Sequence, residues 1–432
     1  MTQPPSDVGL TELAERLSAT WDLQGPSAAL ENLADELERT GKFRQALEAR
    51  LLQARLELGL PAIVDEGGLG SEVPEATRAA YEERYVAAVR RVGHAVLAGG
   101  DLVNAWPYFR LIGEPEPIRQ ALEEDRWLSP ASSASHQGFD PDNPAAPDEE
   151  DQAEARFGRL VEIAFYEGVH PARGLEFILE RHGLCAAITA FDQLPPDRKV
   201  RGRCAGLLAI RLREQLRAGL IHELERRGAA IPETAREPGT SLAPLWVGRP
   251  ELFADDAYHV DVSHLAATVR LASLSDDPQA LSAAIDLADY GSKLAAPFQQ
   301  TSEPPFESLY PDHALYLRGL LGDDPDAVER AVAWLEDRLP DALPRSYVET
   351  LPAQAMVRLL IRHERLVEAA RIATTHLHGV PEAALTVPSP AQLCLRAGPE
   401  GAALLADLAR RHHDLPLLAA ALALTHGTTR NN

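Results

Sequence analysis

The sequence predicts an all-α fold, namely an α-α superhelix (solenoid) of antiparallel helix pairs with a long loop-rich segment in the middle. Three observations support this prediction. Helix-forming residues such as leucine, alanine, arginine and glutamate are abundant, aromatic residues make up only 6% of the 432 residues, and long alternating β-branched runs are absent. A helix-turn-helix spacing occurs twice, at 33–61 and 85–117. A short motif also recurs after 47 residues in the C-terminal half.

A short amphipathic helix is expected first, at 10–20, because Leu10, Leu13 and Leu17 share one face. The earlier helix pair follows, with Ser27 as the expected N-cap of its first helix. Gly41 is expected to end that helix, since glycine adopts the left-handed conformation at low cost. Apolar residues form the two facing stripes of this pair: Leu30, Leu33, Leu37, Phe43, Ala46, Leu47, Leu51 and Ala54.

The later pair has a long first helix, expected at 75–98, that carries Gly93 and ends near Gly100. Ala105 and Phe109 extend the buried stripe of the second helix, and Pro117 stops the pair. Pro107 falls inside the expected second helix, where proline lacks a donor and clashes with the preceding turn. We therefore expect that helix either to be kinked or to begin later than the spacing suggests.

Together these residues resemble the tetratricopeptide repeat, a two-helix unit of degenerate sequence. The resemblance is carried by Gly93, Gly100, Ala105, Phe109, Ile112 and Pro117 in the later copy, and by Ala34, Gly41, Phe43, Ala46 and Pro61 in the earlier one. It is good over 33–117 and loose over 153–425. Since this family offers concave binding surfaces, the resemblance implies a protein-interaction scaffold rather than an enzyme.

The resemblance also implies which side chains line the binding groove, because the first helix of each pair faces it. The matching positions hold Arg90, Arg91 and His94 in the later copy, and Asn32 in the earlier copy, beside Glu31 and Asp35. Family members that grip a peptide C-terminus place basic residues and asparagines at some of these positions. The predicted ligand is therefore an acidic or C-terminal segment of another protein; the alternative is that each side chain belongs to a solvated helix face.

The domain boundary is expected at a polar segment, 129–152, that is rich in serine, proline and acidic residues and has little to bury. It predicts an N-terminal helical arm at 1–128, an acidic linker, and a C-terminal helical-repeat region at 153–432.

The C-terminal region contains the recurring motif, since 274–281 matches 321–328. In both copies an aspartate, Asp277 or Asp324, is placed to cap the next helix, and a proline, Pro278 or Pro325, occupies its first turn. The period fits a two-helix repeat unit with an extended loop.

Charge and composition exclude several function classes. The formal net charge of -23 disfavours general nucleic-acid binding, and the arginine-rich stretch 198–217 is interpreted as a solvated helix face. The N-terminus has no secretory signal, and the longest apolar run, 415–424, is too short to span a bilayer. Three widely spaced cysteines indicate reduced, buried thiols rather than disulfides. We expect a cytoplasmic protein.

One cluster supports an alternative function. His259, Asp261 and His264 lie in the loop-rich region 228–264 and are residue types that bind zinc or manganese. The competing interpretation is that Asp261 caps the helix that follows. Cys185 with the nearby His182 is a weaker nucleophile candidate, for which a buried thiol is the expected alternative. Because no catalytic motif occurs, we predict a non-enzymatic scaffold without a cofactor, with a metal-dependent enzyme as the alternative.

Overall fold

The structure is a computed structural model that describes residues 7–62, 73–124, 149–340 and 346–427. Within these residues the regular structure is helical, and the only strand-like pairing is an isolated bridge between Thr301 and Ser308. The helices pack mostly against their neighbours in the chain, as in a helical repeat protein. The all-α prediction is therefore confirmed. The chain divides into two compact units, 1–177 and 178–432.

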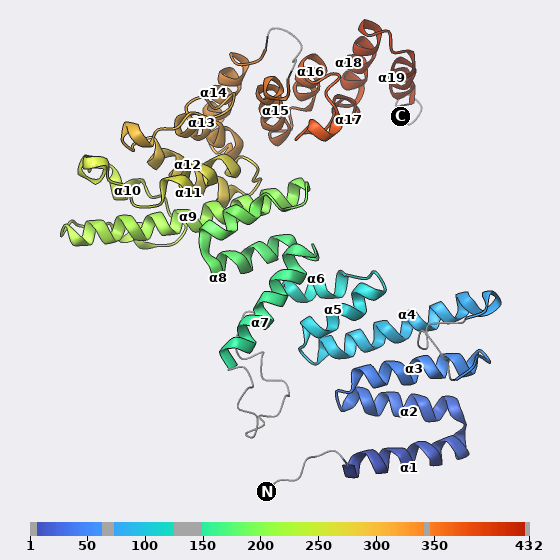
Figure 1. The fold of residues 1–432 in the computed structure, drawn as a ribbon. Coiled ribbons are helices and arrows are strands. Elements are labelled where there is room, and N and C mark those ends of the chain that lie inside the picture. Colours follow the sequence, from blue (N-terminus) through green and yellow to red (C-terminus); the bar gives the residue numbers. More distant parts are fainter. Residues whose placement is uncertain (1–6, 63–72, 125–148, 341–345, 428–432) are drawn as a thin grey trace. The chain divides into compact units, whose positions relative to one another are not determined.

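Unit 1 consists of successive helices, each packed on the next from α1 to α6 (Figure 1). Their bounds are α1 (Asp7–Gln24), α2 (Pro26–Arg39), α3 (Phe43–Glu57), α4 (Glu75–Ala98), α5 (Leu102–Leu111), α6 (Glu116–Leu122) and α7 (Glu149–Val161), followed by a π-helical turn (Glu162–Tyr166) and the first part of α8 (Pro171–Phe191). The helix pairs expected at 33–61 and 85–117 correspond to α2 with α3 and α4 with α5.

Small residues allow both pairs to pack closely. Ala34 of α2 and Ala46 of α3 are completely buried. In the later pair, a Cβ atom on Gly93 would lie only 3.1 Å from Cβ of Tyr108 and 3.2 Å from the ring of Phe109. Glycine therefore permits this close contact where α4 crosses α5. Gly41 and Gly100 have φ of 76° and 86°, so the predicted helix ends are confirmed.

In unit 1 one expectation about a helix start is wrong, and one of the two alternatives for another helix is excluded. Ser27 does not cap α2, because Gly25, with φ of 88°, turns the chain and Pro26 already begins the helix. The Ser27 hydroxyl instead donates to Glu57, at 2.6 Å. The second helix of the later pair does not begin late, because Asp101 caps it by accepting from the backbone N–H of Asn104. Pro107 is thus accommodated inside α5, on its exposed side.

Most of the predicted linker, up to residue 148, lies outside the described residues. Its last residues belong to α7, which begins at Glu149 rather than near residue 153. The linker itself stays a prediction, and the contact-based division falls later, between Phe177 and Ile178.

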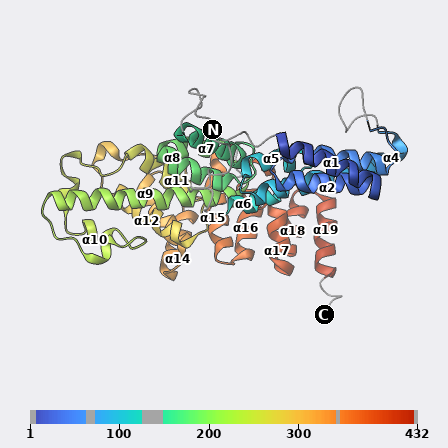
Figure 2. The same cartoon turned by 90° about the horizontal axis from the view of Figure 1, so that it is seen from below.

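Unit 2 begins within α8, where Gly183 has φ of 78° and separates two helical segments, as the sequence indicated. Its further helices are α9 (Arg198–Arg226), α10 (Ala243–Trp246), α11 (Val262–Ala272), α12 (Pro278–Gly291), α13 (Leu309–Leu321), α14 (Pro325–Glu336), α15 (Tyr347–Arg362), α16 (Leu366–His376), α17 (Pro390–Arg396), α18 (Gly398–Arg411) and α19 (Leu415–Gly427). Figure 2 shows the long α9 with the α10 segment beside it. None of the described helices is long and apolar enough to span a membrane.

The 47-residue repeat corresponds to matching helix pairs, α11 with α12 and α13 with α14. Asp277 caps α12 and Asp324 caps α14, each followed by the expected proline. Each of these second helices also meets a glycine. A Cβ atom on Gly206 of α9 would lie 2.9 Å from Cβ of Ala280, and one on Gly319 of α13 would lie 2.6 Å from Cβ of Ala331. The small-residue stripes thus permit close helix crossings.

Candidate functional site

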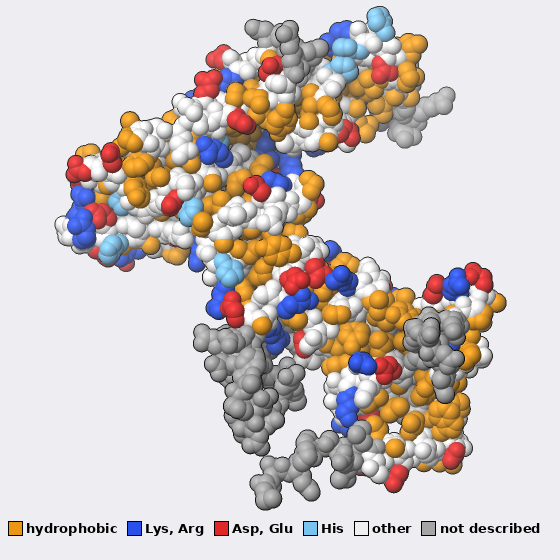
Figure 3. All heavy atoms as spheres, viewed as in Figure 1, with side chains coloured by type: hydrophobic (Ala, Val, Ile, Leu, Met, Phe, Trp, Pro, Cys, Tyr) orange, Lys and Arg blue, Asp and Glu red, His pale blue; other side chains and the backbone are white. Residues whose placement is uncertain are grey.

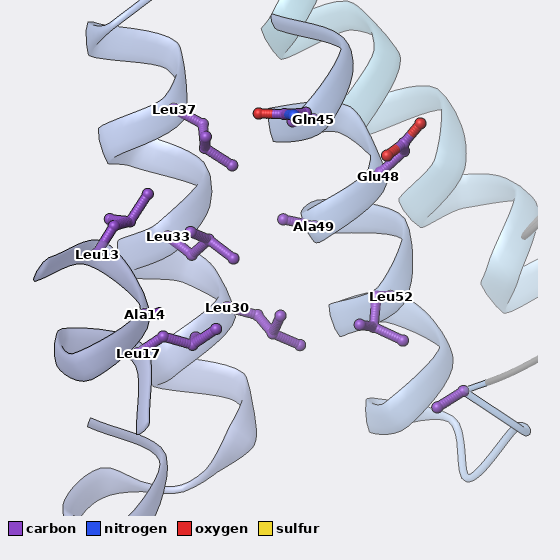
Figure 4. Close-up of a pocket in the computed structure, with 11 residues that line it drawn as sticks. Leu13, Ala14, Leu17, Leu30, Leu33, Leu37, Gln45, Glu48, Ala49 and Leu52 are labelled. Carbon is purple, nitrogen blue, oxygen red and sulfur yellow. The ribbon is translucent and has the colours of Figure 1, made fainter. Parts of the chain in front are cut away.

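Three helices of unit 1, α1, α2 and α3, form a groove that we call the apolar groove. Both α1 and α3 pack on α2, so the leucine stripe of α2 forms the floor between two helical walls. Figure 4 shows Leu30, Leu33 and Leu37 projecting from α2 toward α3, with Ala49 projecting back. These leucines are three and four positions apart, which places them on one helix face.

The groove has a volume of about 430 Å³. Its lining is almost entirely apolar: Leu13, Ala14, Leu17, Leu30, Leu33, Leu37, Ala49, Leu52 and Ala62, with Gln45 and Glu48 as the polar members. Leu30 and Leu37 are buried in the floor, whereas Leu13, Leu17 and Leu52 are only half-buried. Figure 3 shows apolar side chains gathered on the visible face of unit 1. Half-buried leucines on three helices leave apolar area that a ligand could cover.

The rim of the groove carries little charge. Glu48 lines its mouth and accepts from Arg44 at 3.2 Å, but this pair is exposed and follows the i,i+4 spacing along α3. Such a surface pair contributes little to stability and can be exchanged for another partner at low cost. The charges at the rim therefore allow a ligand whose polar side is either neutral or basic.

Arg90, one of the predicted groove residues, is engaged within unit 1. Its guanidinium donates two hydrogen bonds to Glu114, at 2.6 and 2.8 Å. The bidentate pair lowers the pKa of Glu114 and raises the pKa of Arg90, and the hydrogen bonds between them are the largest cause of both shifts. An incoming carboxylate would have to displace Glu114.

Arg91 is paired with the preceding repeat. It donates to Asp35 at 2.7 Å and to Glu38 at 3.4 Å, both on α2. The same two carboxylates accept from Arg50 of α3, at 2.6 and 2.7 Å. The charges of α2, α3 and α4 thus form one four-member network in which Arg50 is buried.

The other two predicted residues lie apart from this network. The ring of His94 packs edge-on against Phe109, with centroids 5.0 Å apart. Asn32 lines a second, more polar cavity of about 310 Å³ between α1 and α2, together with Arg16, Thr20 and Glu36. Asn32 is thus not joined with the arginines in one binding site by any contact that the structure describes.

The structure does not bring His259, Asp261 and His264 together as metal ligands. His259 contacts the hydroxyl of Tyr290 through its backbone N–H, at 2.8 Å, and through Nδ1, at 3.0 Å. Burial lowers the pKa of His259. Asp261 caps α11 by accepting from the backbone N–H groups of Ser263 and His264. In the part of the chain that the structure describes, no group of three or more His, Cys, Asp or Glu side chains is arranged to hold a metal ion.

The loop-rich segment is anchored to α9 by buried arginines, which corrects the interpretation of 198–217 as a solvated face. Arg217 donates to the carbonyl of Ala235 at 2.6 Å and to the carbonyl of Thr240 at 2.5 Å. Arg213 is 1% exposed and lies 4.0 Å from Asp286 of α12. Asp286 in turn accepts from Ser241, and its burial raises its pKa. These side chains hold the segment in place. Their role was not predicted, because a sequence does not show which face of a long helix a loop will cover.

The expectation of a buried thiol at Cys185 is also wrong. Leu184 and Ala187 face the core after the bend at Gly183, which leaves Cys185 exposed between them. Cys204 and Cys394 are buried as expected, and burial raises the pKa of the Cys394 thiol to about 11.

Comparisons of the chain with protein-family models, with curated proteins and with solved structures gave no significant match. The geometry of the groove and the engagement of the predicted side chains are therefore the basis for a functional proposal.

Proposed function

We propose that this protein is a non-enzymatic scaffold of the tetratricopeptide-repeat type, which binds another protein through unit 1. The apolar groove carries the proposal. Partner proteins bind helical repeats through extended surfaces, and an apolar cavity of about 430 Å³ between three helices is of the size that ligands occupy.

The resemblance to this repeat family is supported by the pairwise packing of α2 with α3 and of α4 with α5. It is also supported by the ion pair between Arg91 and Asp35, because both residues occupy positions that face the groove in that family. In a stacked array the first helices of successive pairs line the same face.

The apolar groove is a better candidate for the binding site than the basic residues of α4. Arg90 is paired with Glu114, and Arg91 with Asp35 and Glu38. An acidic or C-terminal peptide at these arginines stays a prediction, and such a peptide must compete with three carboxylates of the protein itself. An apolar segment entering the groove leaves the ion pairs of Arg90 and Arg91 intact, and burying a leucine-sized side chain is favourable by about 1.5–3 kcal/mol before the costs of association.

We also propose a cytoplasmic location. Cys185 is an exposed free thiol. Proteins of oxidising compartments seldom keep an exposed thiol unpaired, whereas reducing compartments preserve it.

A photo-crosslinking amino acid at Gln45, inside the groove, tests the proposal directly. Gln45 is exposed, so the replacement leaves the core intact. The control position is Ala19, which is exposed on α1 and does not line the groove. In extract of the source organism, the Gln45 variant should form a discrete crosslinked band that the Ala19 variant lacks. Equal patterns from both positions would contradict a binding site in the groove.

A further inference from the structure

From the shape and charge of the apolar groove we infer that its ligand is an amphipathic α-helix of a partner protein, with an apolar face and basic residues along one edge. This inference rests on the proposed function and adds the chemical class of the partner. Its basis is the arrangement of α1, α2 and α3, together with the polar groups at the rim.

The shape of the groove fits a helix. Its floor is the stripe of Leu30, Leu33 and Leu37, which runs along α2, and its walls are α1 and α3 (Figure 4). α1 and α3 both pack on α2 but hardly on each other, since each is seated on a different side of it. A fourth helix laid along α2 would contact all three helices. The lining residues of α2 extend from Leu30 to Leu37, so the groove follows about 10 Å of this helix.

The apolar lining sets the spacing of the partner's anchors. The floor offers leucines at positions i, i+3 and i+7 of one helix, and a partner helix fills the spaces between them with apolar side chains of the same spacing. This is the helix-in-groove mode, in which residues three and four apart insert along one stripe. The alanines at 14 and 49 leave room for leucine-sized anchors beside the walls.

The charge of the rim selects the polar edge of the partner. Glu48 is the only ionic side chain in the lining, Gln45 lies beside it, and the chain as a whole carries a net charge of -23. A lysine or arginine of the partner can pair with Glu48 by replacing the exposed Arg44, whereas an acidic edge would meet Glu48 and a negative overall field.

Synthetic peptides of about 14 residues, matched to the length of α2, test this inference. One carries leucines in a single 3–4 stripe with lysines elsewhere, the second has glutamates in place of the lysines, and the third is a scrambled form of the first. Binding to the full-length protein is measured by fluorescence anisotropy in physiological salt. The leucine–lysine peptide should bind at least ~10-fold more tightly than either of the others.

Three exposed positions make the result specific to the groove. Ala14→Trp fills the groove from α1 and should weaken binding at least ~10-fold, whereas Ala19→Trp on the other face of α1 should leave it unchanged. Glu48→Lys should reduce the preference for lysine over glutamate. Equal binding by the two tryptophan variants would overturn the inference, as would equal binding of the leucine–lysine and scrambled peptides.

Two further outcomes distinguish this inference from the proposed function. If the Gln45 crosslink to a partner forms while no amphipathic peptide binds, the partner class is wrong and the scaffold function stands. If light scattering shows a dimer that Ala14→Trp dissociates, the groove binds a second copy of the chain, and the inference of a separate partner is wrong.

Discussion

Arg91 of α4 donates to Asp35 of α2 across a distance of 2.7 Å, although 56 residues separate them in the chain. Both residues occupy positions that the repeat resemblance assigns to the concave surface of the array. The ion pair therefore supports the proposed match between the two helix pairs. It also means that Arg91 is already paired with a carboxylate of the protein. The same contact thus argues for the repeat architecture and against a ready-made acidic-peptide site.

Arg50 should contribute more to the stability of unit 1 than any surface arginine of α3. It is buried and donates to both Asp35 and Glu38. Arg50→Met leaves these carboxylates with Arg91 alone, and we expect a loss of about 1.5–3 kcal/mol. Arg44→Met, which removes the exposed pair with Glu48, should cost less than about 0.5 kcal/mol. Hydrogen exchange of peptides from α2 to α4 measures both losses of stability. Similar exchange in the two variants would show that the network does not stabilise unit 1.

Gly319 should be required for the crossing of α13 and α14. An added Cβ atom would lie 2.6 Å from Cβ of Ala331 and 3.3 Å from Leu359. We expect Gly319→Ala to destabilise the protein by about 1–3 kcal/mol, because overpacking forces the helices apart. The control is Gly158→Ala in α7, where no atom lies within 4 Å of the new methyl group. That variant should gain about 0.5–1 kcal/mol from helix propensity. Urea unfolding followed by circular dichroism tests the pair, and a neutral Gly319→Ala would mean that the crossing is loose.

His313 should make stability depend on acid. It is buried in α13, stacks on Phe306 and lies 2.7 Å through Nδ1 from the carbonyl of Leu309. Burial lowers its pKa to about 4, whereas the unfolded chain has the ordinary value of about 6.5. The unfolded state thus binds the proton first, so the contribution of His313 is complete above pH ~6.5 and is lost as the pH falls to ~4, by up to about 3 kcal/mol.

The variant His313→Asn retains an N–H donor for the Leu309 carbonyl but does not titrate in this range. Its free energy of unfolding should fall less steeply between pH ~6.5 and ~4 than that of the parent. Parallel pH profiles of the parent and the variant would show that His313 is not the buried neutral group we describe.

Arg217 should hold the loop-rich segment on α9. Arg217→Met removes the donors to Ala235 and Thr240, and we expect limited proteolysis to cut near 235–240 at least ~10-fold faster. Arg211→Met serves as the control, because Arg211 is exposed on the same helix. If both variants are cut at the parent's rate, the segment is held by its apolar contacts instead.

The sequence was sufficient for the helix pairs because their signals are local. Gly41 and Gly100 end helices through their own backbone conformations, and Asp277 and Asp324 cap helices two residues away. The predicted cap at Ser27 was wrong because Gly25 and Pro26, just before it, already start the helix.

The candidate site was harder to predict because it depends on contacts between distant residues. The leucine stripes at 13–17 and 30–37 are visible in the sequence, but a stripe does not show whether its partner helices cover it completely. Similarly, Arg90 and Arg91 appear as uncommitted charges in the sequence until the fold brings Glu114 and Asp35 to them. The sequence did contain one signal for the groove: the apolar stripe is broader than a single neighbouring helix can cover.

The central claim is that partners bind in the apolar groove and not at the arginines of α4. The most direct test measures the affinity of the full-length protein for the partner recovered through the Gln45 crosslink, in an Ala14→Trp variant and in an Arg90→Ala, Arg91→Ala double variant. Our account predicts that Ala14→Trp weakens binding at least ~10-fold, while the double variant stays within about 3-fold of the parent. Loss of binding in the double variant, with Ala14→Trp binding as the parent does, would contradict the account and place the site at the arginines.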